Sequence, residues 1–236
     1  MIALTNRLAM VAGLTRDGRP FADIGTDHAY LPASLVEEGR VPHAAASDVR
    51  PGPLQNAAAT LEKYGLSDKV ELLLCSGFEH PALEAYTDFV MAGMGGNLMV
   101  DLLTAAPFLQ REGTHLVLQP QSHAEDVRDW LYRNGFSVLR ETATVDNGRV
   151  YIALETAFTG ETREATLSEC YLGRLPESTA PERFDFFRDV LRRLTARHDA
   201  LLSYPEEQEE CRLLEPVIAD VKALLDTESN YGGNRL

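Results

Sequence analysis

Residues 21–32 read Phe21-Ala22-Asp23-Ile24-Gly25-Thr26-Asp27-His28-Ala29-Tyr30-Leu31-Pro32. This order predicts a short buried strand, a tight glycine turn and the start of a helix. In open α/β sheets, a nucleotide-like cofactor binds at such a junction. The turn lets the backbone approach the ligand, and the helix N-terminus presents free N–H groups. The sequence therefore places a candidate cofactor site at this turn.

The same strand-then-helix order recurs along the first 133 residues. After a leading helix at 3–13, we expect strands at 21–24, 43–48, 69–74, 87–92 and 114–118, and helices at about 30–38, 51–64, 96–103 and 123–133. Strands that alternate with helices in this way predict a parallel sheet covered on both faces and joined by right-handed crossovers.

The pattern changes after residue 133. Residues 136–145 and 149–156 are strand-like runs joined by Asp146-Asn147-Gly148, and Asn-Gly between such runs is a strong hairpin signal. A parallel sheet that ends in an antiparallel hairpin resembles the class I S-adenosylmethionine (SAM) methyltransferases rather than nicotinamide dehydrogenases. The predicted fold is therefore α/β, a Rossmann-like class I methyltransferase sheet over residues 1–157.

Residues 158–236 are predicted to form a linker and a helical, coiled-coil-like second domain. Residues 157–183 are polar and turn-rich, which predicts little regular structure. Two amphipathic segments, 182–202 and 206–225, predict an antiparallel helical hairpin. Pro216 is expected to kink the second helix or delay its start, and residues 229–234 are expected to fray.

Composition limits the possible functions. The net charge of −14 over 236 residues argues against indiscriminate polyanion binding, although it does not exclude a nucleic-acid substrate. The three cysteines are widely spaced, so we expect neither a disulfide framework nor a thiolate metal site, and no metal. No apolar run is long enough for a membrane span, and the N-terminus lacks a signal-peptide pattern. We therefore expect a cytoplasmic protein without a membrane partner.

Residues at the ends of the predicted strands suit a cofactor without a phosphate. The G-x-G-x-x-G dinucleotide pattern is absent, and Asp23 and Gly25 form a turn with one glycine, where a carboxylate can receive the ammonium of SAM. Asp48 is placed to bind the ribose hydroxyls. The other predicted cofactor-binding residues are Ser76 and Gly77, near the adenine, and Gly93. An ordinary strand-to-helix turn is the alternative for Asp23 and Gly25.

A second group of residues is predicted to meet the substrate. Asp27, His28 and Tyr30 follow the turn and are predicted to be catalytic, with a purely structural role as the alternative for His28 and Tyr30. The predicted substrate-binding residues are Met94, Gly95, Gly96, Gln119, Pro120, Gln121, Arg188, Arg192 and Arg193. A flexible loop is the alternative for the glycines, and a turn with a helix cap is the alternative for residues 119–121. With Arg183 and Arg197, the three arginines form a basic cluster that could contact phosphate, or a solvated face paired with nearby acids.

Four motifs together resemble the bacterial tRNA (adenine-N1)-methyltransferases that modify position 22 of tRNA. They are Asp-Ile-Gly-Thr-Asp-His-Ala-Tyr-Leu-Pro (23–32), Ala-Gly-Met-Gly-Gly (92–96), Leu-Gln-Pro-Gln (118–121) and Asp-Asn-Gly-Arg (146–149). The C-terminal helices are also similar to that family's coiled-coil domain. Gln121 stands where the family usually has Asn, and Cys75-Ser76-Gly77 replaces its Gly-Asp-Gly.

The resemblance implies transfer of a methyl group from SAM to N1 of an adenine in tRNA. It also implies that the adenine is turned out of its stack into the site, where Tyr30 or Met94 could stack on it. Asp27 could balance the charge that develops on the ring or take a proton from its amino group, with His28 orienting it. A SAM methyltransferase acting on another RNA or a small molecule, and a non-catalytic SAM-binding scaffold, remain the alternatives.

Overall fold

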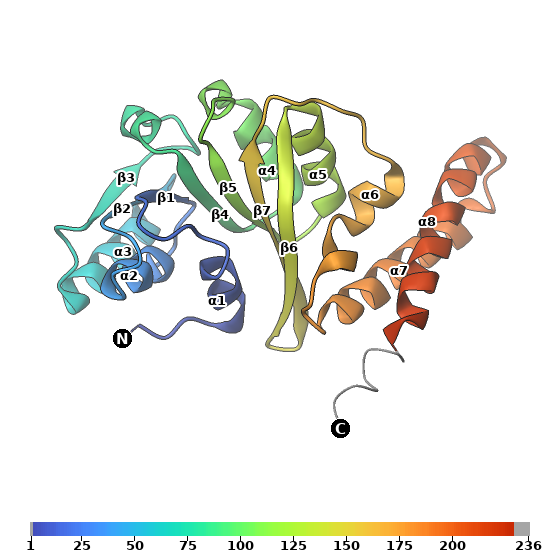
Figure 1. The fold of residues 1–236 in the computed structure, drawn as a ribbon, viewed down its shortest axis with the longest axis horizontal. Helices are drawn as coiled ribbons and strands as arrows, with labels where there is room; N and C mark the ends of the chain where they lie inside the picture. Colours follow the sequence, from blue (N-terminus) through green and yellow to red (C-terminus); the bar gives the residue numbers. More distant parts are fainter. Residues whose placement is uncertain (1, 229–236) are drawn as a thin grey trace.

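The computed structural model describes residues 2–228, and residues 229–234, for which fraying was expected, lie outside the described part. Within residues 2–228, seven strands form one sheet (Figure 1). β7 runs antiparallel to both β5 and β6, whereas β1 to β5 are parallel. The predicted parallel sheet with a terminal antiparallel hairpin is confirmed. The strand order across the sheet is β3 (Val70–Leu74), β2 (Ala44–Asp48), β1 (Phe21–Ile24), β4 (Asp88–Met94), β5 (His115–Pro120), β7 (Arg149–Phe158) and β6 (Phe136–Asp146).

Helices cover both faces of the sheet, and each face has its own apolar core. Side chains alternate between the faces of a strand, so Ala22 and Ile24 of β1 pack in one core while Phe21 packs in the other. Two short 3-10 helices, η1 (Pro81–Ala85) and η2 (Pro107–Leu109), lie in the connections before β4 and β5. One face carries α1 (Asn6–Ala12), α2 (Tyr30–Glu37) and α3 (Pro51–Tyr64), and the other carries α4 (Gly96–Thr104) and α5 (Ala124–Arg133) (Figure 1).

The turn between β6 and β7 has the geometry that its sequence predicts. Asn147 and Gly148 have φ values of 49° and 73°, and Asp146 pairs with Arg149 across the turn. Two successive positive φ values are typical of the two-residue hairpin turn that favours Asn-Gly. Because β6 runs parallel to β5, this turn lies at the same edge of the sheet as the carboxyl ends of β1 to β5.

Two long C-terminal helices pack against each other beyond β6 (Figure 1). They are α7 (Arg183–Leu201) and α8 (Gln208–Asp226), joined through the 3-10 helix η4 (Pro205–Glu207). Apolar side chains from both helices are buried, which confirms the predicted helical hairpin. Pro216 lies inside α8 and does not delay its start.

The prediction that residues 157–183 have little regular structure is wrong. The helix α6 (Leu167–Leu172) and the 3-10 helix η3 (Leu175–Glu177) form there. Thr166 and Glu169 make a capping box at the start of α6, which satisfies N–H groups that a helix start leaves free. Tyr171 and Leu175 are buried in the same core as residues of α4 and α5. Because these apolar residues are few and scattered, no periodic pattern reveals them in the sequence.

A buried ion pair fastens α6 to the sheet. The side chains of Arg128 in α5 and Glu141 in β6 are fully buried and joined by two hydrogen bonds of 2.9 and 2.8 Å. Nη1 of Arg128 also donates to the carbonyl oxygens of Cys170 (2.7 Å) and Tyr171 (3.2 Å). The apolar core is therefore continuous across residue 157, while the division into two domains at that residue stays a prediction.

Candidate functional site

The turn after β1 is fixed by the neighbouring strand. The backbone N–H groups of Gly25 and Thr26 both donate to the carbonyl oxygen of Ser47 in β2, at 2.8 Å. Gly25 has a φ of 81°, a conformation that side-chain-bearing residues rarely adopt. The turn therefore depends on glycine, and Gly25 is exposed at the carboxyl edge of the sheet.

Asp23 is a buried carboxylate beneath this turn. Its exposed fraction is 7%, and burial raises its pKa from 3.8 to about 6. A hydrogen bond with Thr26 and the positive charge of Arg7 oppose this rise. A carboxylate held in a poorly solvated place gains strongly from an incoming cation, so Asp23 is suited to receive an ammonium group.

The three predicted catalytic residues lie together at the start of α2. His28 and Tyr30 stack with their ring centroids 5.2 Å apart, and Nε2 of His28 lies 3.4 Å from Oδ2 of Asp27. Ala29 between them has a φ of 52°, and its N–H donates to the Thr26 hydroxyl. The rings border a hollow of about 240 Å³ lined also by Asn56, Thr60, Lys63 and Tyr64 of α3, whereas Asp27 is largely exposed.

The cofactor residues predicted on β2 and β3 continue along the same edge. Asp48 is 8% exposed, and its Oδ1 accepts a hydrogen bond from the Arg50 backbone at 2.8 Å. Ser76 and Gly77 follow β3 and are half-buried, and a Cβ at Gly77 would lie 2.6 Å from a methyl carbon of Leu102. Strands β3, β2 and β1 are adjacent, so these side chains form one row with Asp23.

The glycines after β4 make room mainly for protein atoms. A Cβ at Gly96 would overlap the carbonyl oxygens of Ser122 and His123, and the N–H of Gly96 donates to Ser122. A Cβ at Gly25 would lie 2.5 Å from Cε of Met94, so this methionine covers the β1 turn. Packing thus accounts for Gly96, and the substrate roles predicted for residues 94–96 stay predictions.

Arg7 is a site residue that the sequence did not reveal. Its Nη1 donates to Oε1 of Gln119 at 2.8 Å, and its guanidinium lies 5.9 Å from the centroid of the Tyr151 ring. A Cβ at Gly93 would be 3.2 Å from Nη1. The leading helix was predicted, but nothing in the sequence links its polar face to strands more than 80 residues away.

The end of β5 faces a groove that reaches α7. Gln119 is fully buried, and the N–H of Gln121 donates to the carbonyl oxygen of Met94 at 2.9 Å. The groove has a volume of about 470 Å³ and is lined by Gln121, Tyr151 and Arg193, among other residues. The groove, which Pro120 also lines, therefore connects the end of β5 to Arg193, one of the arginines predicted to contact phosphate.

The arginine cluster on α7 is paired with acids. Arg192 and Arg193 both contact Asp189, at 2.6 and 3.0 Å, and Arg188 contacts Asp185 at 2.8 Å. Arg183 is buried, with its guanidinium 4.4 Å from the centroid of the Phe184 ring, whereas Arg188, Arg192 and Arg193 are more exposed. Arg188, Arg192 and Arg193 therefore form ion pairs on a solvated helix face, as the alternative interpretation expects. Their contact with phosphate stays a prediction.

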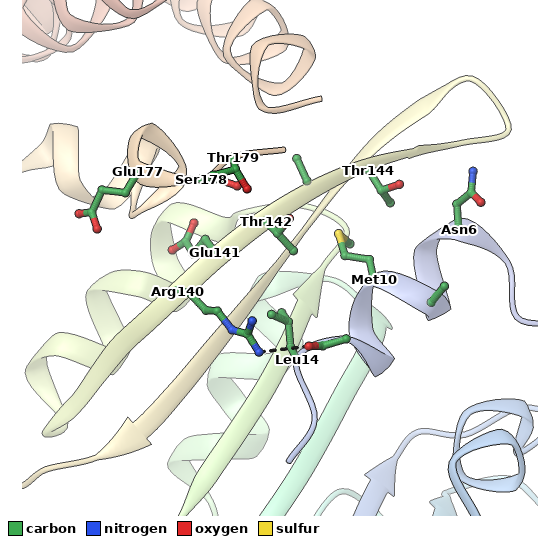
Figure 2. A pocket seen from close by; sticks show the side chains of 13 residues that line it. Asn6, Met10, Leu14, Arg140, Glu141, Thr142, Thr144, Glu177, Ser178 and Thr179 are labelled. Carbon is green, nitrogen blue, oxygen red and sulfur yellow. Dashed lines mark hydrogen bonds between the residues drawn. The ribbon is translucent and has the colours of Figure 1, made fainter. Parts of the chain in front are cut away.

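A second hollow, of about 630 Å³, lies between α1 and β6 (Figure 2). Met10 and Leu14 line one side and Thr142 and Thr144 the other, and Ser178 and Thr179 also line it. Its three charged lining residues, Arg140, Glu141 and Glu177, all form ion pairs with other residues. The hollow therefore offers no uncompensated charge for catalysis.

The edge of the sheet fits SAM. Two carboxylates, Asp23 and Asp48, occupy the ends of adjacent strands, and the exposed turn at Gly25 lies between them. A carboxylate at the end of β2 suits two ribose hydroxyls, and Asp23 suits an ammonium.

Within residues 2–228, no cluster of three His, Cys, Asp or Glu side chains could hold a metal, and no helix is long and apolar enough to cross a membrane.

Comparisons with known proteins give consistent matches. A family model described as a methyltransferase domain matches residues 4–154. A tRNA (adenine(22)-N1)-methyltransferase of Bacillus subtilis is 33% identical over 153 residues, which are 65% of this chain and 64% of that protein. A Mycoplasma pneumoniae protein named provisionally as a tRNA methyltransferase is 28% identical and matched over 82% of this chain and 92% of its own length.

Solved structures match nearly the whole chain. A Streptococcus agalactiae protein of the NADB-Rossmann superfamily has a TM-score of 0.80 at 30% identity, covering 94% of this chain and 97% of that one. A Streptococcus pneumoniae protein, provisionally named a tRNA (adenine(22)-N1)-methyltransferase, is solved in complex with SAM. It has a TM-score of 0.80 at 28% identity and covers 94% of this chain and 100% of its own.

Proposed function

We propose a SAM-dependent tRNA (adenine-N1)-methyltransferase activity for this chain, which belongs to the methyltransferase domain family. The observation that carries the proposal is the row of Asp23 and Asp48 beside a turn with one glycine, a site built for a cofactor without phosphate. The relatives named as tRNA methyltransferases support adenine N1 of tRNA as the methyl acceptor, with position 22 as the target. A tRNA substrate would place the protein in the cytoplasm.

The cofactor is held by residues at the ends of three adjacent strands. SAM, when bound, would supply an electrophilic methyl group for in-line displacement by the lone pair of adenine N1, with the electrons of the broken S–C bond left on sulfur as the thioether S-adenosylhomocysteine. Asp23 receives the ammonium, Asp48 binds the ribose hydroxyls, and Ser76 and Gly77 lie beside the adenine ring of the cofactor. Because no covalent intermediate is needed, orienting the two reactants supplies most of the acceleration.

Asp27, His28 and Tyr30 are proposed to act on the target adenine. Asp27 is exposed beside the β1 turn, where its carboxylate can balance the positive charge on the methylated ring or accept a proton from the amino group. The contact of 3.4 Å with His28 can orient that carboxylate. Tyr30, 42% exposed and stacked on His28, offers an aromatic face for an unstacked base.

The groove between β5, β7 and α7 is the proposed path of the RNA strand. It is lined by Gln121, whose amide can bond a base edge, and by Arg193, which can meet a phosphate. Tyr151 and Arg149 also line it, and Arg149 makes no ion pair within residues 2–228. A phosphate could compete with Asp189 for Arg193, because an exposed ion pair contributes only about 0–1 kcal/mol.

The activity is tested by incubating the full chain with methyl-labelled SAM and total bacterial tRNA, followed by nucleoside analysis. Label in 1-methyladenosine is the expected result. Label in another nucleoside or in a small molecule would favour a methyltransferase of different specificity. SAM binding without any methyl transfer would favour the non-catalytic scaffold.

A further inference from the structure

Arg7 is carried to the site by the first turn of α1. Thr5 caps this helix by accepting a hydrogen bond from the Leu8 N–H. The backbone N–H of Arg7 donates to Oδ2 of Asp146 at 3.2 Å, and the Asn6 amide donates to the carbonyl oxygen of Val145 at 3.0 Å. The β6–β7 turn therefore holds the start of α1 over the carboxyl ends of the strands.

The guanidinium of Arg7 is half-buried and has no carboxylate within ion-pair distance, although its positive charge acts on the nearby buried carboxylate of Asp23. Among residues 2–228 its side chain donates one hydrogen bond, to Gln119, and forms no ion pair. A guanidinium has five N–H donors, so others remain available. Removing a cation from water without pairing it with an anion is costly. Asp23 and the ring of Tyr151 offset part of this cost, and an anion bound directly to the free N–H donors of Arg7 would offset more of it.

The backbone at Gly93 is shaped around this cation. Gly93 has a φ of 87°, and a Cβ at this position would lie 3.2 Å from Nη1 of Arg7. A side chain here would thus be strained and would crowd the guanidinium. The close approach connects Arg7 to the end of β4, which lies next to β1 in the sheet.

We propose that Arg7 binds the carboxylate of the methionine part of SAM. This inference rests on the proposed function only in requiring that SAM binds. The strand order runs β2, β1, β4, β5, so a ligand with its ribose at Asp48 and its ammonium at Asp23 directs its amino-acid end towards Gly93 and Arg7. The amino-acid end carries one positive and one negative charge, which match a buried carboxylate and a half-buried guanidinium.

The test compares SAM with decarboxylated SAM, which keeps the sulfonium and the amine but lacks the carboxylate. Calorimetry gives the dissociation constant of each ligand for the wild type, Arg7→Met and Arg7→Lys. The wild type should bind SAM about 10- to 100-fold more tightly than the analogue, as a charge-assisted contact predicts. Arg7→Met should lose this preference by weakening SAM binding alone, and Arg7→Lys should restore part of it.

Arg19→Met is the matched control, since Arg19 is exposed just before β1 at the opposite edge of the sheet. It should keep the full preference for SAM. If Arg7→Met lost affinity equally for SAM and for decarboxylated SAM, the inference would be overturned, because the loss would then come from a displaced α1. Unchanged SAM binding with weaker tRNA binding would also overturn it and assign Arg7 to the RNA. If the wild type bound neither ligand, the proposed function itself would fail.

Discussion

Asp23→Asn should stabilise the ligand-free protein at neutral pH while weakening SAM binding. Asp23 is buried, and burial raises its pKa from 3.8 to about 6. Above pH 6 the folded protein therefore holds a charge that the unfolded chain solvates better. Asparagine keeps the size of the side chain and its ability to accept the Thr26 hydrogen bond, and it removes the charge.

The magnitude follows from the shift. At about 1.4 kcal/mol per pKa unit, a rise from 3.8 to about 6 lowers the free energy of unfolding by about 3 kcal/mol at neutral pH. The direction of the pH dependence follows because the pKa of Asp23 is higher in the folded protein than in the unfolded chain. Between these two pKa values the folded state binds more protons, so stability falls as pH rises. The gain in Asp23→Asn should thus be about 1 kcal/mol at pH 4.5 and about 3 kcal/mol at pH 7.5.

The assay is urea unfolding followed by circular dichroism at pH 4.5, 5.5 and 7.5, together with calorimetry of SAM binding at pH 7.5. The affinity for SAM should fall about 10- to 100-fold, because the ammonium loses its carboxylate. Asp68→Asn, a change at an exposed carboxylate, is the control and should alter neither quantity measurably. A stability gain that is independent of pH would refute the burial argument. Unchanged SAM affinity would refute the proposed contact.

Three further changes test other parts of the structure. Asp27→Asn should lower turnover on tRNA at least 10-fold while SAM affinity stays within about 2-fold; lost SAM binding with intact turnover would contradict the catalytic role. Gly173→Ala should lower the free energy of unfolding by about 3–5 kcal/mol, because its Cβ would force apart the buried pair of Arg128 and Glu141. Gly65→Ala is the control, since Gly65 has a similar positive φ and open space around it, and it should lower the free energy of unfolding by only about 1–2 kcal/mol. Equal losses of stability for the two variants in urea unfolding would refute the argument that Gly173 makes room for the buried ion pair. Arg193→Ala should reduce the slope of log affinity for tRNA against log salt, whereas Arg188→Ala, outside the groove, should not; equal slopes would remove Arg193 from the RNA path.

Because the core is continuous, deleting the C-terminal helices would also disturb the rest of the protein. Tyr171, Leu175 and Phe187 pack in the same core as α4 and α5, and Arg128 reaches across to α6. Removing residues 158–236 would expose this surface and leave Arg128 and Glu141 open to water. Single substitutions on α7 therefore report on RNA binding more cleanly than a truncation.

The sequence alone predicted the seven strands, the α-helices other than α6, and the residues at the strand ends. Asp23, Gly25 and Asp48 could be assigned to one edge because the carboxyl ends of parallel strands meet there, whatever the details of packing. The hairpin followed from Asn147-Gly148, whose positive φ values are a local property. The methyltransferase family indicated by these motifs is confirmed by the comparisons.

Only the tertiary structure decided which side chains face one another. Arg7 meets Gln119 across 112 residues, and Arg128 meets the carbonyl oxygen of Cys170 across 42. Such pairs depend on how helices dock on the sheet, and local periodicity carries no information about docking. For the same reason the sequence could not tell that Gly96 makes room for residues 122 and 123. The chain's local pattern fixes where the backbone places the proposed site, and long-range packing fixes which charged side chains meet there.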